Sequence, residues 1–269
     1  MIIRTRTIVS AGMAVLLAAG PVSAQDAGED WDFGQDQARD LSIAAVTFDT
    51  FGVAVRCLDE TLSVVVSGLP TREGIQTFDY QMGERTDDDS LWVSGGRNQS
   101  AFALWPAHVA RDLRRGGRFA LGIPDGERVR RIAVDLPASP SAIGRVFEAC
   151  DREMPEDSTD APDRENLAGL QWRTRPTPTF PARTESETGV AAIICGVAGS
   201  GALRQCRVES EFPEGGGFGR AAVLGAHRTG RVEIKDGETG TMEDRRVSFY
   251  VRYGLGLDLP PIPTRLPPR

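Results

Sequence analysis

The chain has 269 residues, of which 31 are Lys or Arg and 38 are Asp or Glu, and its formal net charge is −7. This acidic balance argues against nonspecific binding to nucleic acids or anionic lipid surfaces, because both depend on an excess of basic residues. The length is sufficient for one large domain or two small ones with packed cores.

The first 24 residues have the pattern of a secretory signal peptide. Arg4 and Arg6 precede the apolar stretch 8–20, and Val22-Ser-Ala24 fits the small-residue cleavage pattern. The apolar stretch is short for a membrane span, which needs about 20 residues. We therefore expect a cleaved signal peptide over residues 1–24 and export to the periplasm. An uncleaved segment would instead anchor the chain in the inner membrane.

An N-terminal domain of mixed sheet and helix is expected over residues 25–151. The stretches that alternate or cluster as strands are Ser42–Phe48, Val53–Cys57, Leu62–Ser67, Ser90–Val93, Ala101–Leu104, Arg118–Ile123 and Arg128–Asp135. Two helices are predicted, one over residues 106–115 with Pro106 at its first position and one over 139–150 with Ser139 as its cap. This half resembles no family that we recognise.

Four cysteines behind an export signal indicate two disulfide bonds. Cys57 shares one side of its predicted strand with Val53 and Val55, and Cys150 lies on the apolar face of its predicted helix with Val146. Both thiols are therefore expected to face the core. We predict a Cys57–Cys150 disulfide that ties this helix to the sheet, and two free buried thiols are the alternative.

The composition changes over residues 152–175 and again over residues 256–269. Low hydrophobicity, repelling carboxylates and prolines make the first range typical of a disordered linker, with an acidic binding segment as the alternative. The second range contains five prolines. It is expected to be an extended tail that is either inert or a ligand for an aromatic groove.

A hairpin with two cysteines opens the C-terminal region. Residues 190–197 are rich in the β-branched side chains typical of a strand, Ser200-Gly201 is a two-residue turn signal, and residues 202–210 form the return strand. With this turn, the numbers of opposite residues sum to 401, so Cys195 faces Cys206. Opposed residues without mutual hydrogen bonds have Cα atoms about 4.5 Å apart, within reach of a disulfide. We therefore predict a cross-strand Cys195–Cys206 bond.

The region around this hairpin contains several features in a fixed order. Phe180-Pro181 opens it, Gly217-Phe-Gly-Arg-Ala-Ala222 begins a short helix, and Gly240 precedes the alternating strand Arg246–Tyr253. This order resembles the C-terminal domain of TonB-type proteins, in its two-cysteine variety, over about residues 176–255. The resemblance implies antiparallel strands packed on a short helix. We accordingly expect an α+β fold class for the whole chain.

In that family the C-terminal domain lies in the periplasm and pairs by edge-strand addition with a segment of an outer-membrane transporter. The resemblance implies this role for the last strand, and the alternative is that the strand only fills the core. The residues that it assigns to partner binding are Val247, Ser248, Phe249, Tyr250, Val251, Arg252 and Tyr253.

An energy transducer of this family also needs an uncleaved membrane helix and a long Pro-rich span. We therefore expect an exported protein-binding module, whose partner is an envelope protein or peptide segment such as one of an outer-membrane transporter. An atypical energy transducer and an envelope hydrolase are the two alternatives.

The sequence points to no catalytic, cofactor or metal site. His108 and His227 have no further ligand at metal-binding spacing, and Asp87-Asp-Asp89 fits a solvated turn better than a calcium loop. Residues 217–222 match Gly-x-Gly-x-x-Ala but lack the buried strand that normally precedes a nucleotide-binding loop. We expect no enzymatic activity, no bound cofactor and no nucleic-acid partner.

Overall fold

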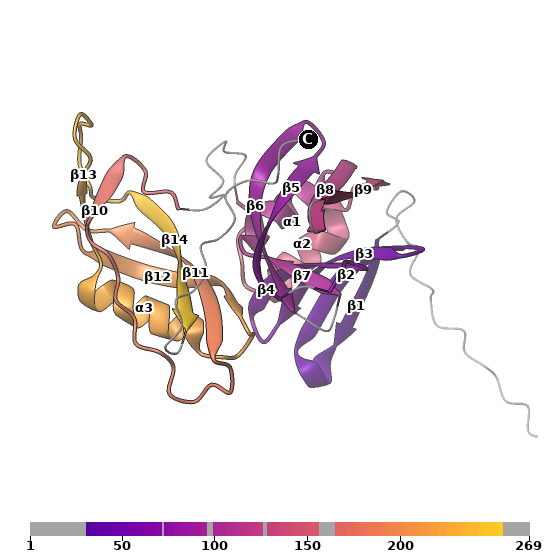
Figure 1. The fold of residues 1–269 in the computed structure, drawn as a ribbon, viewed down its shortest axis with the longest axis horizontal. Helices are drawn as coiled ribbons and strands as arrows, with labels where there is room; N and C mark the ends of the chain where they lie inside the picture. The colour runs from indigo at the N-terminus through magenta and orange to yellow at the C-terminus, as the bar shows by residue number, and fades with distance from the viewer. Residues whose placement is uncertain (1–30, 72, 96–98, 126–127, 156–164, 255–269) are drawn as a thin grey trace, which may run out of the picture.

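The computed structural model describes residues 31–71, 73–95, 99–125, 128–155 and 165–254 (Figure 1). The expected signal peptide and the expected Pro-rich tail lie outside the described residues. No helix in the part of the chain that the structure describes is long and apolar enough to cross a membrane.

The N-terminal part, residues 31–155, is built on one nine-stranded sheet in which every neighbouring pair is antiparallel. Its strands are β1 (Asp32–Asp36), β2 (Leu41–Phe48), β3 (Phe51–Leu58), β4 (Thr61–Ser67), β5 (Glu73–Met82), β6 (Arg85–Gly95), β7 (Ser100–Ala103), β8 (Gly117–Asp125) and β9 (Arg128–Leu136), with the 3₁₀ turn η1 (Gln37–Arg39) after β1. The strand order is β1-β2-β3-β4-β7-β6-β5-β8-β9. Edge strands are therefore β1 and β9.

Two helices, α1 (Pro106–Arg114) and α2 (Pro140–Ala149), pack against this sheet and cover its core (Figure 1). Both begin with a proline, which has no N–H to leave unpaired in the first turn. The predicted cap of α2 is wrong in one respect, because the Ser139 side chain makes no capping hydrogen bond. The core between helices and sheet includes Phe78, Trp92, Phe119 and Ile143, each of which is almost fully buried.

A disulfide joins Cys57 of β3 to Cys150 at the end of α2, with Cα atoms 5.5 Å apart. Val53, Val55 and Cys57 are all buried, and the residues between them are more exposed, because alternate side chains of a strand point to opposite faces. The bond is the pairing that this alternation predicts, and it fixes α2 to the sheet.

The C-terminal part, residues 165–254, contains a three-stranded antiparallel sheet, a two-stranded sheet and one helix. Its elements are β10 (Leu170–Thr174), β11 (Thr188–Val197), β12 (Leu203–Phe212), α3 (Phe218–Thr229), β13 (Arg231–Ile234) and β14 (Arg246–Gly254). The larger sheet has the order β12-β11-β14, and β10 pairs with β13. Helix α3 packs on one face of β11 and β12 (Figure 1).

The expected α+β fold class is wrong. The described residues form a mostly antiparallel, β-rich fold, with 52% of them in strands and three α-helices. The fold class was predicted wrongly because several strands contain too few apolar residues for their sequences to indicate a strand. The segment Asp87–Asp89, expected as a turn, belongs to β6, and both β1 and β5 are missing from the predicted elements.

The predicted hairpin has the right partners but the wrong turn. Val197 pairs with Leu203, so the loop is longer than two residues, and Ala198 donates a backbone hydrogen bond to Ala202. A register shift between Ile194 and Gly196 then adds one residue to the return strand. This bulge restores the expected register, so Cys195 and Cys206 are bonded, with Cα atoms 4.0 Å apart.

Residues 156–164 of the expected linker over residues 152–175 lie outside the described residues, and its expected end is too late in the chain. Strand β10 lies within that range, and Leu170 at its start is buried in the core of the C-terminal part. The polarity of residues 165–175 hides this short strand, because only one of its side chains is fully buried.

The N-terminal and C-terminal parts pack against each other through an apolar cluster. The cluster contains buried and half-buried side chains of β5, β6, β11, β12 and β14 and of the two residues between β7 and α1. Its members are Ile75, Leu91, Val93, Leu104, Trp105, Val190, Ala192, Ile194, Phe212 and Tyr250. Alternate residues of β11 therefore face either this cluster or α3, so the strand is buried on both sides, as its continuous apolar sequence requires.

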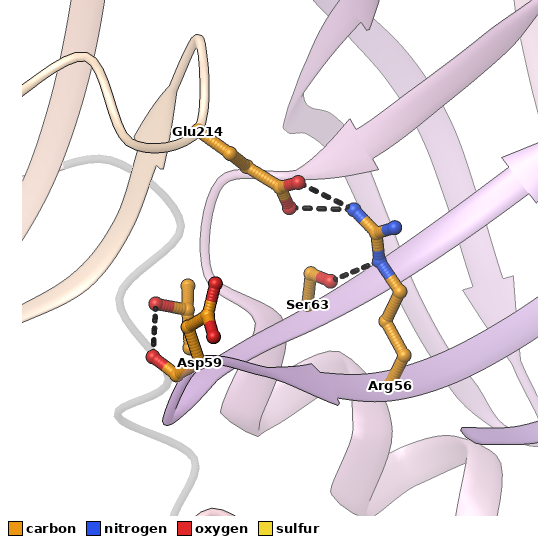
Figure 2. Close-up of polar contacts among 5 residues, drawn as sticks. Arg56, Asp59, Ser63 and Glu214 are labelled. Atoms are coloured by element: carbon orange, nitrogen blue, oxygen red, sulfur yellow. Dashed lines mark hydrogen bonds and ion pairs between the residues drawn. The ribbon is translucent and has the colours of Figure 1, made fainter. Parts of the chain in front are cut away.

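Polar contacts join the two parts beside this cluster. The Arg56 side chain of β3 donates to both carboxylate oxygens of Glu214, at 2.6 and 2.7 Å, and to the Ser63 hydroxyl at 2.9 Å (Figure 2). The Ser210 hydroxyl donates to the carbonyl oxygen of Leu104 at 2.6 Å. These contacts orient the C-terminal sheet on the N-terminal one.

Candidate partner-binding edge strand

Strand β14 is at the edge of the C-terminal sheet and contains all residues of the sequence-predicted binding strand. It pairs with β11 along its full length, from Arg246 opposite Gly196 to Gly254 opposite Thr188. On its other side the sheet ends. An edge strand offers backbone N–H and C=O groups that an extended peptide can pair with.

The side chains on one face of β14 build the core rather than a binding surface. Val247, Phe249 and Tyr253 are buried in the C-terminal core; Tyr253 contacts Phe218 of α3, and the Trp172 and Phe249 rings meet edge to face at 5.0 Å. Val251 is half-buried and packs on the same core. The core-filling interpretation of this face and the edge-binding hypothesis are compatible, because the outward backbone groups take no part in the side-chain packing.

The side chains on the opposite face of β14 lie toward the N-terminal part or toward solvent. Ser248 is buried, Tyr250 is half-buried in the cluster between the two parts, Arg252 is half-buried, and Arg246 is exposed. The N-terminal part therefore supports this face near Tyr250. That support holds β14 in place without covering the whole edge.

The direction of the outward backbone groups follows from one observed contact. Ser248 exchanges both of its backbone hydrogen bonds with Asn166, at 2.8 and 2.9 Å, on the side away from β11. In an antiparallel strand, residues two and four positions further on present their N–H and C=O in the same direction. Tyr250 and Arg252 are those residues. Within the described residues, no backbone partner lies on their outer side.

The opposite edge of this sheet, β12, is less accessible. The guanidinium of Arg152 donates to the Val208 carbonyl oxygen at 3.3 Å and lies 3.0 Å from the Glu209 carboxylate. Glu209 is also 2.9 Å from the Arg207 guanidinium, and its side chain is 1% exposed. At Val208 the N-terminal part thus contacts the β12 edge, whereas among the described residues the outward backbone groups of Tyr250 and Arg252 on β14 have no backbone partner.

The N-terminus of α3 is occupied by a side chain of the protein itself. The Glu211 carboxylate accepts hydrogen bonds from the backbone N–H of Gly217 at 3.3 Å and of Gly219 at 2.6 Å. These are the amides that would bind a phosphate in a nucleotide-binding loop. The carboxylate therefore takes the place of an anionic ligand and stabilises the positive end of the helix.

Tyr253 contributes to the fold and not to an open site. Its hydroxyl donates to the Phe218 carbonyl oxygen at 2.9 Å, and its ring contacts those of Phe180 and Phe218. Burial raises the pKa of the Tyr253 phenol well above its ordinary value, and the nearby carboxylate of Glu211 adds to this rise. The phenol therefore stays protonated and remains a hydrogen-bond donor.

This raised pKa predicts a loss of stability at alkaline pH. In the unfolded chain the phenol ionises near its ordinary pKa of about 10, whereas in the folded protein it keeps its proton. Below about pH 10 the stabilisation is complete, and above it the free energy of unfolding falls as pH rises. Urea unfolding at about pH 8 and about pH 11 should show a smaller alkaline loss in Tyr253→Phe than in the unmodified chain. Equal losses would contradict this role.

The remaining candidate groups do not come together. His227 is exposed at the last turn of α3, and His108 lies on α1 of the N-terminal part. The described residues contain no group of three or more His, Cys, Asp or Glu side chains that could hold a metal ion.

Sequence reasoning missed two features of the candidate site. These are the Asn166 contact with β14 and the Arg152–Glu209 pair beside the β12 edge. No signal in the sequence indicates the second, because Glu209 lies on the same side of its strand as the exposed Gln205 and Arg207.

Comparisons of this chain with protein-family models, curated proteins and solved structures found no match. The TonB-type resemblance over about residues 176–255 therefore stays a prediction that rests on the order of features between Phe180 and Tyr253.

Proposed function

We propose that the protein is an exported binding protein whose C-terminal part accepts an extended segment of an envelope protein along β14. The observation that carries this proposal is that, among the described residues, the outer backbone groups of Tyr250 and Arg252 have no backbone partner, on a strand whose inner side is fully paired. Added strands gain affinity from backbone hydrogen bonds and specificity from alternate side chains. The TonB-type resemblance supports the same strand and suggests a segment of an outer-membrane transporter as the partner.

The two disulfides fit an extracytoplasmic protein, since such bonds persist in oxidising compartments. We propose the periplasm as the location, because the residues before 25 have the sequence pattern of a signal peptide. A periplasmic location would place β14 where the periplasmic segments of envelope proteins are accessible.

Replacement of Arg252 by proline or by alanine distinguishes the contribution of its backbone N–H to partner binding from that of its side chain. Proline removes the outward N–H of Arg252 but leaves the bonds to β11, because prolines are tolerated at edge positions whose N–H faces away from the sheet. Alanine keeps that N–H. We expect Arg252→Pro to weaken partner binding by about tenfold or more, and Arg252→Ala to weaken it less.

Photo-crosslinking in the native host measures this difference. A photoreactive phenylalanine analogue replaces Gly254, at the end of β14 beyond Arg252, and the adducts are separated by size and identified by mass spectrometry. The proposal predicts a polypeptide adduct that Arg252→Pro removes and Arg252→Ala retains, with thermal unfolding unchanged in both. An adduct that survives proline, or no adduct at all, would contradict the proposal.

A further inference from the structure

The middle of the β14 edge is already occupied by a segment of the same chain. The backbone N–H of Asn166 donates to the Ser248 carbonyl oxygen at 2.9 Å, and the Ser248 N–H donates to the Asn166 carbonyl oxygen at 2.8 Å. This is an antiparallel pair reduced to a single residue. We call residues 165–169 the covering segment.

The covering segment is held firmly at its C-terminal end. The Asn166 side-chain oxygen accepts a hydrogen bond from the Ala168 N–H at 2.8 Å, and the Arg245 guanidinium donates to the Ala168 carbonyl oxygen at 2.8 Å. Ala168 and Gly169 both have positive φ, which turns the chain away from β14. Leu170 then enters the core at the start of β10.

Its N-terminal end is held by an exposed ion pair. The Arg175 guanidinium donates to the two carboxylate oxygens of Glu165 at 2.9 and 3.1 Å, but the Arg175 side chain is 68% exposed. Exposed ion pairs contribute little to stability. The half-buried Leu167 packs on the C-terminal core, so the covering segment is fixed from Leu167 onward and is weakly held only at Glu165 and Asn166, where it reaches β14.

The covering segment also limits the length of any added strand. While Asn166 stays in place, an incoming strand can pair only with the outward groups beyond Ser248, those of Tyr250, Arg252 and Gly254. After separation, the outward groups of Ser248 and Arg246 become available too. The number of backbone hydrogen bonds that a partner can form thus depends on the position of Asn166.

We propose that the covering segment is an autoinhibitory contact, which a partner strand must displace from Ser248 to bind along the whole of β14. This inference rests on the proposed function, since it assigns regulation to the same edge. The binding free energy of the partner is reduced by the free energy of separating Asn166, so a variant that opens the contact binds more tightly.

The charges beside the edge indicate a suitable probe. Arg246 and Arg252 lie on one face of β14, and Val247 and Val251 lie on the other. Opposite charges and apolar pairs on neighbouring strands are favourable. A fluorescent peptide of alternating Glu and Val residues presents carboxylates to the two arginines and valines to the other face. The same peptide with Lys in place of Glu is its control.

Asn166→Pro is the test variant, because proline lacks the N–H that bonds the Ser248 carbonyl oxygen. Asn166→Ala is the matched control, since it removes the side-chain oxygen but keeps that N–H. Amide hydrogen exchange at Ser248 in the full-length chain without peptide should become about tenfold faster in Asn166→Pro and should change less in Asn166→Ala. Unaltered exchange at Ser248 in the proline variant would overturn the inference.

Fluorescence anisotropy with the Glu-Val peptide completes the test. The inference predicts binding that is about tenfold tighter in Asn166→Pro than in the unmodified chain, and a loss of this gain when Arg252→Pro is added. Equal binding to the unmodified chain and to Asn166→Pro would overturn the autoinhibitory contact and leave the proposed function standing. No binding to either would overturn both.

Discussion

Replacement of Cys57 and Cys150 together by serine is expected to lower the free energy of unfolding by about 4 to 5 kcal/mol, which is the largest loss that we predict for this protein. The two cysteines are 93 residues apart, so their bond removes a long closed loop from the freedom of the unfolded chain. The expected fall in the midpoint of thermal unfolding is on the order of 10 °C or more. Urea unfolding and calorimetry both measure the effect.

The second disulfide provides an internal control. Cys195 and Cys206 are only 11 residues apart, and the same model gives their bond about 3 kcal/mol. The serine variant of this pair should therefore retain more stability than the variant of the first pair. If the two variants lose equal stability, or the order is reversed, the loop-entropy explanation is wrong for this fold.

Arg152→Met is expected to lower the free energy of unfolding by about 3 kcal/mol. The Arg152 guanidinium is 3.0 Å from the Glu209 carboxylate, whose side chain is 1% exposed. Without Arg152, the partner that this carboxylate keeps among the described residues is Arg207, whose own side chain is 46% exposed. A buried charge that loses a partner is costly, whereas loss of both charges costs much less.

A double-mutant cycle measures the interaction free energy between Arg152 and Glu209, apart from the effect of each substitution on other contacts. Glu209→Gln in the Arg152→Met background should recover most of the lost stability, because no uncompensated charge then remains. Glu214→Gln is the control, because the Arg56–Glu214 contact between the two parts is more exposed, with 31% of the Glu214 side chain accessible. It should lower the free energy of unfolding by less than about 1 kcal/mol. Additive losses in the cycle would show that Arg152 and Glu209 do not interact as described.

The cysteine pairing was predictable because it depends on local alternation. The positions of Val53, Val55 and Cys57 on one side of a strand, and of Cys150 on the apolar side of a helix, are visible in the sequence. The Cys195–Cys206 bond was predicted correctly, but from a two-residue turn that the structure does not contain. The loop is longer than expected, and the bulge between Ile194 and Gly196 offsets the difference.

The fold class was not predictable from the same patterns, because strand formation in β1, β5 and the first half of β6 depends on neighbours distant in sequence. Asp87–Asp89 has the composition of a turn, yet β6 pairs there with β5. A pleated strand needs backbone partners more than apolar side chains. The helices, by contrast, begin at prolines or at Gly217 and carry one apolar face each, and all three were predicted near their observed positions.

The candidate site was only partly predictable. The alternation of Val247, Phe249 and Val251 identified the strand, and the resemblance suggested that it lies at an edge. The contact of Asn166 with Ser248 joins residues 82 positions apart (248 minus 166) through backbone groups alone, and backbone pairing of a single residue leaves no mark on side-chain composition. The contact of the Arg152 side chain with Val208 and Glu209 was not predictable either, because it joins residues that are distant in sequence.

Amide hydrogen exchange along β14 of the full-length chain, with and without the Glu-Val peptide, tests the central claim most directly. If an extended polypeptide adds to this edge, the outward amides of Tyr250 and Arg252 should exchange about tenfold more slowly when the peptide is bound. The Val251 amide, which already bonds to β11, should change much less. Slower exchange confined to other elements, or unchanged exchange at Tyr250 and Arg252, would contradict the account.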